Sequence, residues 1–342
     1  ALFMNAGLPV ADGDYLHLDR FVPIAAISAL AWVALIGGAA ALAVKRPKAD
    51  RVVALAASAA LIVVQAAGVI GVATDQRVLD STQHQPIVAT HEGLYTLSPD
   101  QNVVVFVLDT YDQRYLNEAL EADPGLLDEF TGFTCFTNST GSMIPTRYAM
   151  PFLMTGRMPD GTQGFKDFAR TWFEEGTLLG DLQAQGYEMG IYTDSLGTDI
   201  RNVEPYAMNI HAAEERPLDA PQMLAVLDRV GLYRDVPWVL KPLFWFSTDD
   251  LNKAFTASGE LEKRPYIVDD GRFGHGLRDQ GVSLNDEGKS FRLIHLLGPH
   301  KPYSLDEHGN SSPTPTSREQ QARGFQRAVV VQHPTSAVLV YA

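Results

Sequence analysis

Two long uncharged segments near the start of the chain constrain its fold most. Residues 21–44 and residues 52–74 contain no Asp, Glu, Lys or Arg. As helices rising 1.5 Å per residue, each would extend about 35 Å, which is enough to cross the hydrocarbon core of a bilayer. Buried core helices of a soluble protein are the alternative, but helices of that length usually keep a polar face. We therefore predict two transmembrane helices within residues 21–74.

The charges around these segments predict their orientation. The connecting segment 45–51 (KRPKADR) has four basic residues against one acid, and short basic loops stay in the cytoplasm. The segment 1–20 carries Asp12, Asp14 and Asp19 against Arg20. We therefore expect a multi-pass protein of a bacterial cell membrane. Its N-terminal segment 1–20 and everything after residue 75 would lie outside the cytoplasm, with the lipid bilayer as its first partner.

The overall composition excludes several classes of protein. Lys and Arg total 27 and Asp and Glu total 41, so the formal net charge is −14. A protein that binds nucleic acid needs the opposite balance, and we expect no nucleic-acid partner. Apolar residues make up 46% of the chain and charged residues 20%, which excludes global disorder. Cys135 is the only cysteine, which excludes an internal disulfide.

An α/β domain is predicted after a polar linker at residues 75–101. Short continuous apolar runs are typical of strands buried on both faces of a parallel sheet, and strands that alternate with helical stretches indicate βαβ units. The predicted strands are 102–108, 188–193 and 291–297, and the predicted helices are 113–130 and 177–185. We assign the domain to residues 102–322, with a mostly parallel central sheet. Residues 323–342 form an atypical tail, in which valines 329–331 and 338–340 are candidate strands.

Five residues are candidates for chemistry. Asp109 follows the first buried strand, where parallel sheets bind ligands, although a helix cap or an Asx turn would also place an Asp there. Thr146 and Arg147 lie in GSMIPTRYAMPFLMTG, where a hydroxyl before a helix is either a nucleophile or an ordinary capping group. His295 and His300 surround the end of the third strand. A neutral imidazole there can bind a metal or a substrate oxygen, or be purely structural.

A further segment, 238–246 (WVLKPLFWF), is an aromatic cluster with one lysine. Tryptophan is favoured at membrane surfaces, so this segment either contacts the bilayer or packs in a core around Pro242.

The order of these motifs resembles the alkaline phosphatase superfamily. Three motifs carry the resemblance. They are a hydrophobic strand ending in Asp109-Thr110, then TRYAMP at 146–151, then a strand ending near HKPY at 300–303. The nearest branch contains lipoteichoic acid synthases, phosphoethanolamine transferases and sulfatase-like proteins. It implies a sulfatase-like, alkaline-phosphatase-like catalytic domain outside the cytoplasm and a lipid or envelope-glycan substrate.

The resemblance also implies residue roles. Asp109 and Thr146 would bind a divalent metal (Mn, Zn, Mg or Ca), and Thr146 would be the nucleophile that forms a covalent phospho-threonine. His300 would contact the substrate phosphate, with Arg147 and His295 also binding substrate. Sulfatases of this superfamily carry a Cys or Ser that is oxidised to formylglycine. Met143 stands at that place here, which argues against a formylglycine sulfatase.

The end of the chain departs from the family pattern. Members carry an Asp-His-Gly that completes the metal site, whereas no Asp-His pair follows His300. The sequence at 306–309 (DEHG) comes too soon after His300, and we interpret it as a loop. We therefore expect a domain truncated at its C-terminus, for example by a frameshift near Arg323. The alternatives to an active phosphotransferase or ester hydrolase are then a catalytically inactive fragment or a non-catalytic binding protein. A transporter subunit is disfavoured, since neither span carries a charge.

Overall fold

The computed structural model describes residues 5, 8, 18–75, 87–128, 130–141, 143–174, 176–193, 195, 200–212, 220–246, 270–286, 288–301, 303, 305–310, 312, 316–325 and 337–341. The chain divides into two compact units. The first, unit 1, combines Ala1–Pro86 with Asp219–Ala254. The second, unit 2, combines Ile87–Leu218 with Phe255–Ala342.

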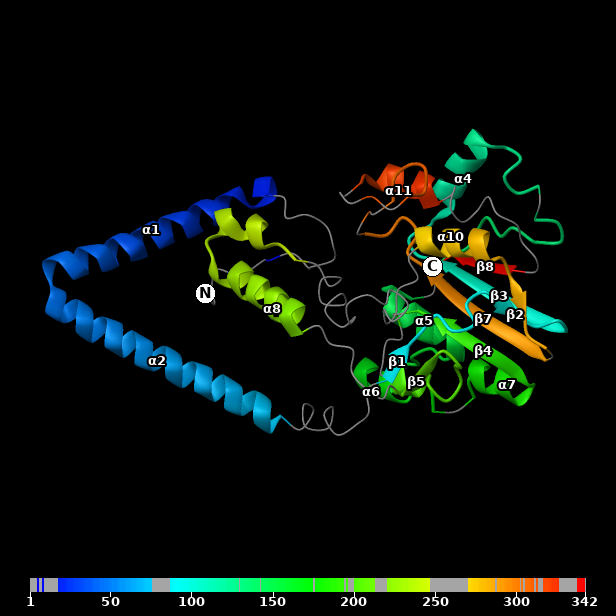
Figure 1. The fold of residues 1–342 in the computed structure, drawn as a ribbon, viewed down its shortest axis with the longest axis horizontal. Helices are drawn as coiled ribbons and strands as arrows, with labels where there is room; N and C mark the ends of the chain where they lie inside the picture. Colours follow the sequence, from blue (N-terminus) through cyan, green and yellow to red (C-terminus); the bar gives the residue numbers. More distant parts are fainter. Residues whose placement is uncertain are drawn as a thin grey trace. The chain divides into compact units, whose positions relative to one another are not determined.

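Two long helices dominate unit 1 (Figure 1). A short 3-10 helix, η1 (Leu18–Phe21), leads into α1 (Val22–Lys45), and α2 (Pro47–Thr74) follows after Arg46. A proline in the first turn starts each helix, where its missing N–H costs no hydrogen bond. Both helices are long and apolar enough to cross a membrane, and almost none of their apolar surface is buried. Core helices of a soluble protein would show the opposite burial.

Two further helices described in unit 1 pack near the start of α1. Helix α8 (Ala220–Asp235) is followed by the 3-10 helix η3 (Trp238–Phe244). Trp238 is fully buried, and its ring centroid lies 5.0 Å from that of Phe21. The aromatic segment at 238–246 therefore does contribute to a core, as one of its two interpretations predicts. Its cluster also includes Tyr233 and Ala25.

A four-stranded parallel sheet forms the centre of unit 2 (Figure 1). Its order is β4 (Tyr187–Tyr192), β7 (Lys289–Leu296), β3 (Gln101–Leu108) and β8 (Ala337–Tyr341). The predictions of a parallel sheet and of strands near 102–108, 188–193 and 291–297 are confirmed. The tail contributes β8, which pairs in parallel with β3 and contains the candidate strand 338–340. The candidate strand 329–331 lies outside the described residues.

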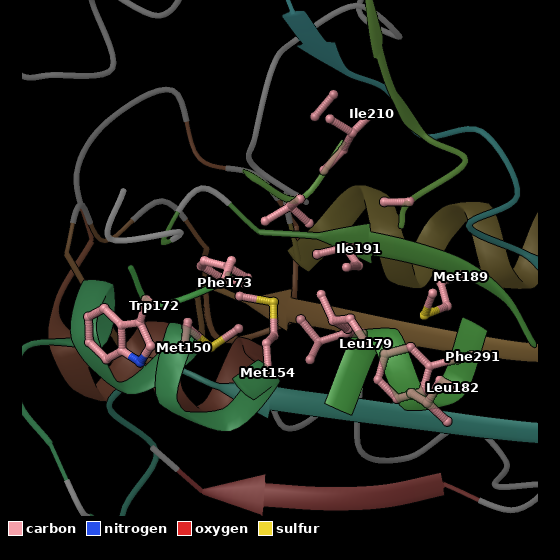
Figure 2. Close-up of a cluster of buried hydrophobic side chains, with 14 of the residues drawn as sticks. Met150, Met154, Trp172, Phe173, Leu179, Leu182, Met189, Ile191, Ile210 and Phe291 are labelled. Atoms are coloured by element: carbon pink, nitrogen blue, oxygen red, sulfur yellow. The ribbon is translucent and has the colours of Figure 1, made fainter. Parts of the chain in front are cut away.

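Helices cover both faces of this sheet. On one face lie α5 (Thr146–Thr155), α6 (Phe165–Arg170) and α7 (Leu178–Ala184). Figure 2 shows the core on this side, where Met150 and Met154 of α5 and Leu179 of α7 point towards strand residues such as Ile191 and Phe291. On the other face lie α4 (Gln113–Ala122), α10 (Asp270–Gln280) and α11 (Arg318–Phe325).

Some local predictions differ from the structure. The helix expected over 113–130 ends at Ala122, because the next residue, Asp123, precedes Pro124 and is biased away from helical backbone angles. Two short strands, β1 (Ile87–Ala89) and β2 (Thr96–Leu97), fall in the segment assigned to the linker. They pair with β5 (Ile210–Ala212) and β6 (Ser283–Leu284) respectively. The sequence at 306–309 forms a turn, as expected for a loop.

Candidate active site

Polar residues lie at the carboxyl ends of three strands, on the same face of the sheet. Side chains alternate along a strand, so Asp109 continues the row of Val105 and Val107 after β3. The same alternation places His295 of β7 in the row of Phe291 and Leu293, which belong to the cluster under α5. Thr193 likewise continues the row of Met189 and Ile191 beyond β4. The apolar face that α5 covers therefore ends in Thr193, His295 and Asp109 at the carboxyl ends of adjacent strands.

Helix α5 brings a hydroxyl to this edge. Thr146 is the first residue of α5, and Met150 and Met154 follow at intervals of four on the same face of the helix. Both methionines are fully buried against the sheet. Their packing fixes the rotation of α5 about its axis, and the side chain of Thr146 is directed to the carboxyl edge as a result.

The four polar side chains form a connected set. Thr146 Oγ1 donates a hydrogen bond to Asp109, at 3.3 Å from Oδ1 and 3.5 Å from Oδ2. His295 Nε2 lies 3.5 Å from Asp109 Oδ2, a distance typical of an ion pair rather than a short hydrogen bond. The other ring nitrogen, Nδ1, is 2.9 Å from Thr193 Oγ1. Asp109 is thus held between a hydroxyl and an imidazole whose ring orientation Thr193 fixes.

Burial and neighbouring groups shift the pKa of Asp109 in opposite directions. Only 8% of the residue is exposed, and this burial alone would raise the pKa of its carboxyl. The close polar contact with His295 and the charge of its ring lower the pKa, as do the charge of His300 and the hydrogen bond from Thr146. Their combined effect exceeds that of burial, so the pKa of Asp109 is lower than its ordinary value. Asp109 is therefore an ionised hydrogen-bond acceptor at neutral pH.

Two buried polar residues support the loop that follows β7. Asp270 of α10 accepts hydrogen bonds from the backbone N–H of Leu297 and of Gly298, each at 2.8 Å. Gln321 of α11 donates to the carbonyl of Gly298 at 2.9 Å. Gly298 itself touches Asp109, since a Cβ at this position would lie 2.5 Å from the Asp109 carbonyl oxygen. Asp270 and Gln321 were not among the predicted site residues, because nothing in the sequence signals that they become buried.

His300 and Arg147 lie differently from the other predicted residues. His300 is half-buried at the end of the supported loop, with Nδ1 2.5 Å from the carbonyl oxygen of Lys301, and its charge acts on Asp109. Arg147 is exposed, with its guanidinium over the ring of Tyr148 at 4.8 Å. The structure thus brings Asp109, Thr146 and His295 together, leaves His300 at the margin of the set, and places Arg147 on another face of α5.

The backbone at this edge is strained. Thr110 has φ of 54°, in the left-handed region that residues with branched side chains rarely adopt. Its Oγ1 is buried without a hydrogen-bond partner in the described parts of the chain. Such strain costs about 1–3 kcal/mol and is concentrated at functional sites. The strain at Thr110 therefore supports a functional site at the carboxyl end of β3.

The described residues do not make a complete metal site. Within the ranges given above, no group of three or more His, Cys, Asp or Glu side chains is arranged to hold an ion. Asp109, Thr146 and His295 offer one carboxylate, one hydroxyl and one imidazole. Zinc usually takes four ligands, and calcium or magnesium about six or more oxygens. This donor set does not fit the divalent metal that the sequence resemblance implies.

Comparisons with known proteins show a distant structural likeness. No protein-family profile and no curated protein matches the chain. A solved structure of a protein in the alkaline phosphatase superfamily from Vibrio parahaemolyticus is similar to it, with a TM-score of 0.37 and 12% sequence identity. The similarity covers 72% of this chain and 52% of the other, so the chain spans about half the length of that protein.

Proposed function

We propose that this protein is a membrane-anchored phosphotransferase, or a phosphoric or sulfuric ester hydrolase, that acts on cell-envelope lipids or glycans. Thr146 is its nucleophile. The observation that carries the proposal is the hydrogen bond from Thr146 Oγ1 to the ionised, nearly buried Asp109 at the carboxyl edge of a parallel sheet. A hydroxyl aimed at a carboxylate has a proton acceptor already in place, which is the basic arrangement of an activated nucleophile.

The first chemical step follows from this geometry. Thr146 Oγ1 attacks the phosphorus or sulfur atom of the ester, and its proton passes to Asp109 as the new bond forms. The bond to the leaving alcohol breaks, and the alcohol takes a proton from solvent. A carboxylate with a lowered pKa is a weak base, so the transfer occurs late, once the attacking hydroxyl has become acidic. His295 then stays paired with the carboxyl group.

The surroundings of Thr146 favour an anionic substrate. The N-terminus of α5 carries a partial positive charge, and its free backbone N–H groups can donate hydrogen bonds to an anion. His300 adds a side chain that can donate to a substrate oxygen from the supported loop after β7. In the second step, water or an acceptor hydroxyl attacks the phospho-threonine and releases its proton to solvent, while the bond to Thr146 Oγ1 breaks and Thr146 recovers its proton from Asp109.

The membrane part of the proposal comes from unit 1. The exposed apolar surfaces of α1 and α2 are costly in water, and a bilayer removes that cost. The basic segment between them favours the cytoplasmic side, and we infer from this that unit 2 lies outside the cytoplasm. Envelope lipids and glycans are the phosphate and sulfate esters available there.

The direct test is to trap the covalent intermediate. The full chain is purified in detergent and incubated with bis(4-nitrophenyl) phosphate, 4-nitrophenyl phosphate or 4-nitrophenyl sulfate, with and without added Mn²⁺ or Zn²⁺. Acid-quenched protein is then mapped by mass spectrometry. We expect a modified Thr146, no modification in Thr146→Ala, and an unchanged result in Thr140→Ala, which removes an exposed hydroxyl six residues earlier. An unmodified Thr146 under every condition would contradict the proposal.

A second candidate is a non-catalytic protein that binds phosphate or sulfate esters at the same edge. It is favoured by the lack of a three-residue metal cluster among the described residues. Binding of inorganic phosphate that is weakened by His300→Ala, in a protein that forms no modified Thr146, would support it over the enzyme.

A further inference from the structure

The exposed side of η3 is entirely apolar. Four of its residues are exposed, and they are Val239, Leu240, Pro242 and Leu243, which we call the η3 surface. Leu243 is 74% exposed and Val239 is 47% exposed. Contiguous exposed apolar residues are uncommon on a protein surface that faces water, and they mark sites of contact with a partner or a membrane.

The charged residue of η3, Lys241, is buried inside the protein. Lys241 is fully buried, although lysine is among the residues least often buried. Its Nζ donates to the carbonyl oxygens of Tyr233 and Arg234 at the end of α8, and to Asn5 Oδ1 at 3.2 Å. It also lies 5.0 Å from the centroid of the Tyr233 ring. The ammonium group thus satisfies the C-terminal carbonyls of α8 and leaves no charge on the η3 surface.

The η3 helix lies beside the first turns of α1. The Trp238 ring packs on Phe21, and the Trp238 backbone N–H donates to Ser28 Oγ at 3.2 Å. Residues 21–28 cover roughly 10 Å along α1 at 1.5 Å per residue. On the membrane topology proposed above, this is the depth between the headgroups and the upper acyl chains.

We propose that the η3 surface is inserted into the outer leaflet of the bilayer beside α1, with lipid acyl chains as its occupant. Residues 220–246 are then a third membrane contact, and they follow the first part of unit 2 in the sequence. The inference rests on the proposed membrane anchoring by α1 and α2. The η3 helix contacts α1, whose first turns also expose apolar residues such as Val22 and Ile27. Lys241 would be costly at this depth if it were not paired internally.

Depth-dependent fluorescence quenching tests the proposal on the full chain. In a Cys135→Ser background, single cysteines are introduced by Leu243→Cys or Val239→Cys and labelled with NBD. The protein is reconstituted in phosphatidylethanolamine and phosphatidylglycerol vesicles. Leu35→Cys, in the middle of α1, reports on membrane crossing. Leu284→Cys, which replaces an exposed leucine of unit 2, is the matched control.

The expected result is several-fold stronger quenching of the labels at 239 and 243 by lipids with a doxyl group near the headgroup than of the label at 284. The label at 35 should be quenched more by lipids with a doxyl group deep in the acyl chain. Iodide serves as the water-soluble quencher. If lipids quench the label at 35 but iodide quenches the labels at 239 and 243, the η3 proposal is overturned and the anchoring stays intact. Labels at 239 and 243 protected from both quenchers also overturn it, since a protein partner then covers the surface. A label at 35 that lipids do not quench overturns the anchoring itself.

Discussion

Thr146 Oγ1 donates a hydrogen bond to the carboxylate of Asp109, 37 residues earlier in the chain, with 3.3 Å between Oγ1 and Oδ1. Two independent periodicities create this contact. The two-residue alternation of β3 carries Asp109 to the face that α5 covers, and the four-residue spacing of α5 carries Thr146 to the same face. The pairing therefore depends on the packing of Met150 and Met154, which holds α5 in place.

Asp109→Asn should remove the proton acceptor and keep the shape of the side chain. General bases contribute about 10²–10⁴-fold to rate, so we expect esterase turnover to fall by about 10²-fold or more. The rate of modification of Thr146 should fall in parallel when followed by quenched-flow mass spectrometry. Asp123→Asn, at an exposed position after α4, is the control and should behave as the unmodified protein. Equal rates in the two variants would exclude Asp109 as the acceptor.

The central sheet and the core of the site could be predicted from the sequence, because both depend on local patterns. The valine-rich run 102–108 indicated a strand buried on both faces, and its last polar neighbour, Asp109, had to lie at the carboxyl edge. Thr146 and His295 were identified by type and position. That they contact Asp109 was not evident, since it depends on the relative placement of α5 and β7.

The remaining features depend on contacts distant in sequence. Asp270 and Gln321 support Gly298 from two different helices, and neither lies in a pattern that signals burial. The burial of Lys241 is also not evident from the sequence, since a lysine next to a proline normally indicates an exposed turn. The packing of Trp238 on Phe21 joins residues more than 200 positions apart, and local periodicity carries no information on such pairs.

Asp112 should make stability depend on pH in acid. It caps α4 by accepting a hydrogen bond from the Arg114 backbone N–H at 2.9 Å. The side-chain hydrogen bond from Arg114 is the main cause that lowers the pKa of Asp112 below its ordinary value. A lowered pKa in the folded state gives stability that is present above the unfolded pKa and lost as the pH falls through the folded pKa. The loss should therefore occur below about pH 4.

Two substitutions separate the charge of Asp112 from its cap. Asp112→Asn keeps the capping oxygen and cannot titrate, so its urea midpoint should fall less steeply below about pH 4 than that of the unmodified protein. Asp112→Ala loses the cap and should cost about 1 kcal/mol at neutral pH. Both are measured by near-ultraviolet circular dichroism of the full chain in detergent micelles. Identical acid slopes for the unmodified protein and Asp112→Asn would contradict the assignment.

Arg292 should be critical for stability, because it is fully buried and hydrogen-bonded to backbone carbonyls. Its Nε donates to Gly93 and Thr96 at 3.1 and 3.0 Å, and Nη1 donates to Glu188 at 2.9 Å. Arg292→Met would remove these buried hydrogen bonds, and we expect it to lower the free energy of unfolding by about 3–5 kcal/mol. Glu188→Gln affects only the half-exposed carboxylate and should cost less than about 1 kcal/mol. Similar urea midpoints for the two variants would refute this role.

Gly298→Ala should damage both the stability and the site. Its φ of 55° already disfavours an L side chain, and the added Cβ would lie 2.5 Å from the Asp109 carbonyl oxygen. Gly281→Ala is the matched control, since Gly281 has φ of 69° at the end of α10 with nothing within 4 Å of its added Cβ. The control should lose about 1–2 kcal/mol from backbone strain and keep its activity. Gly298→Ala should lose a further ~1–3 kcal/mol from the clash, together with most of the esterase activity, because Asp109 must move. If the two variants lose equal stability and both remain active, Gly298 does not position Asp109.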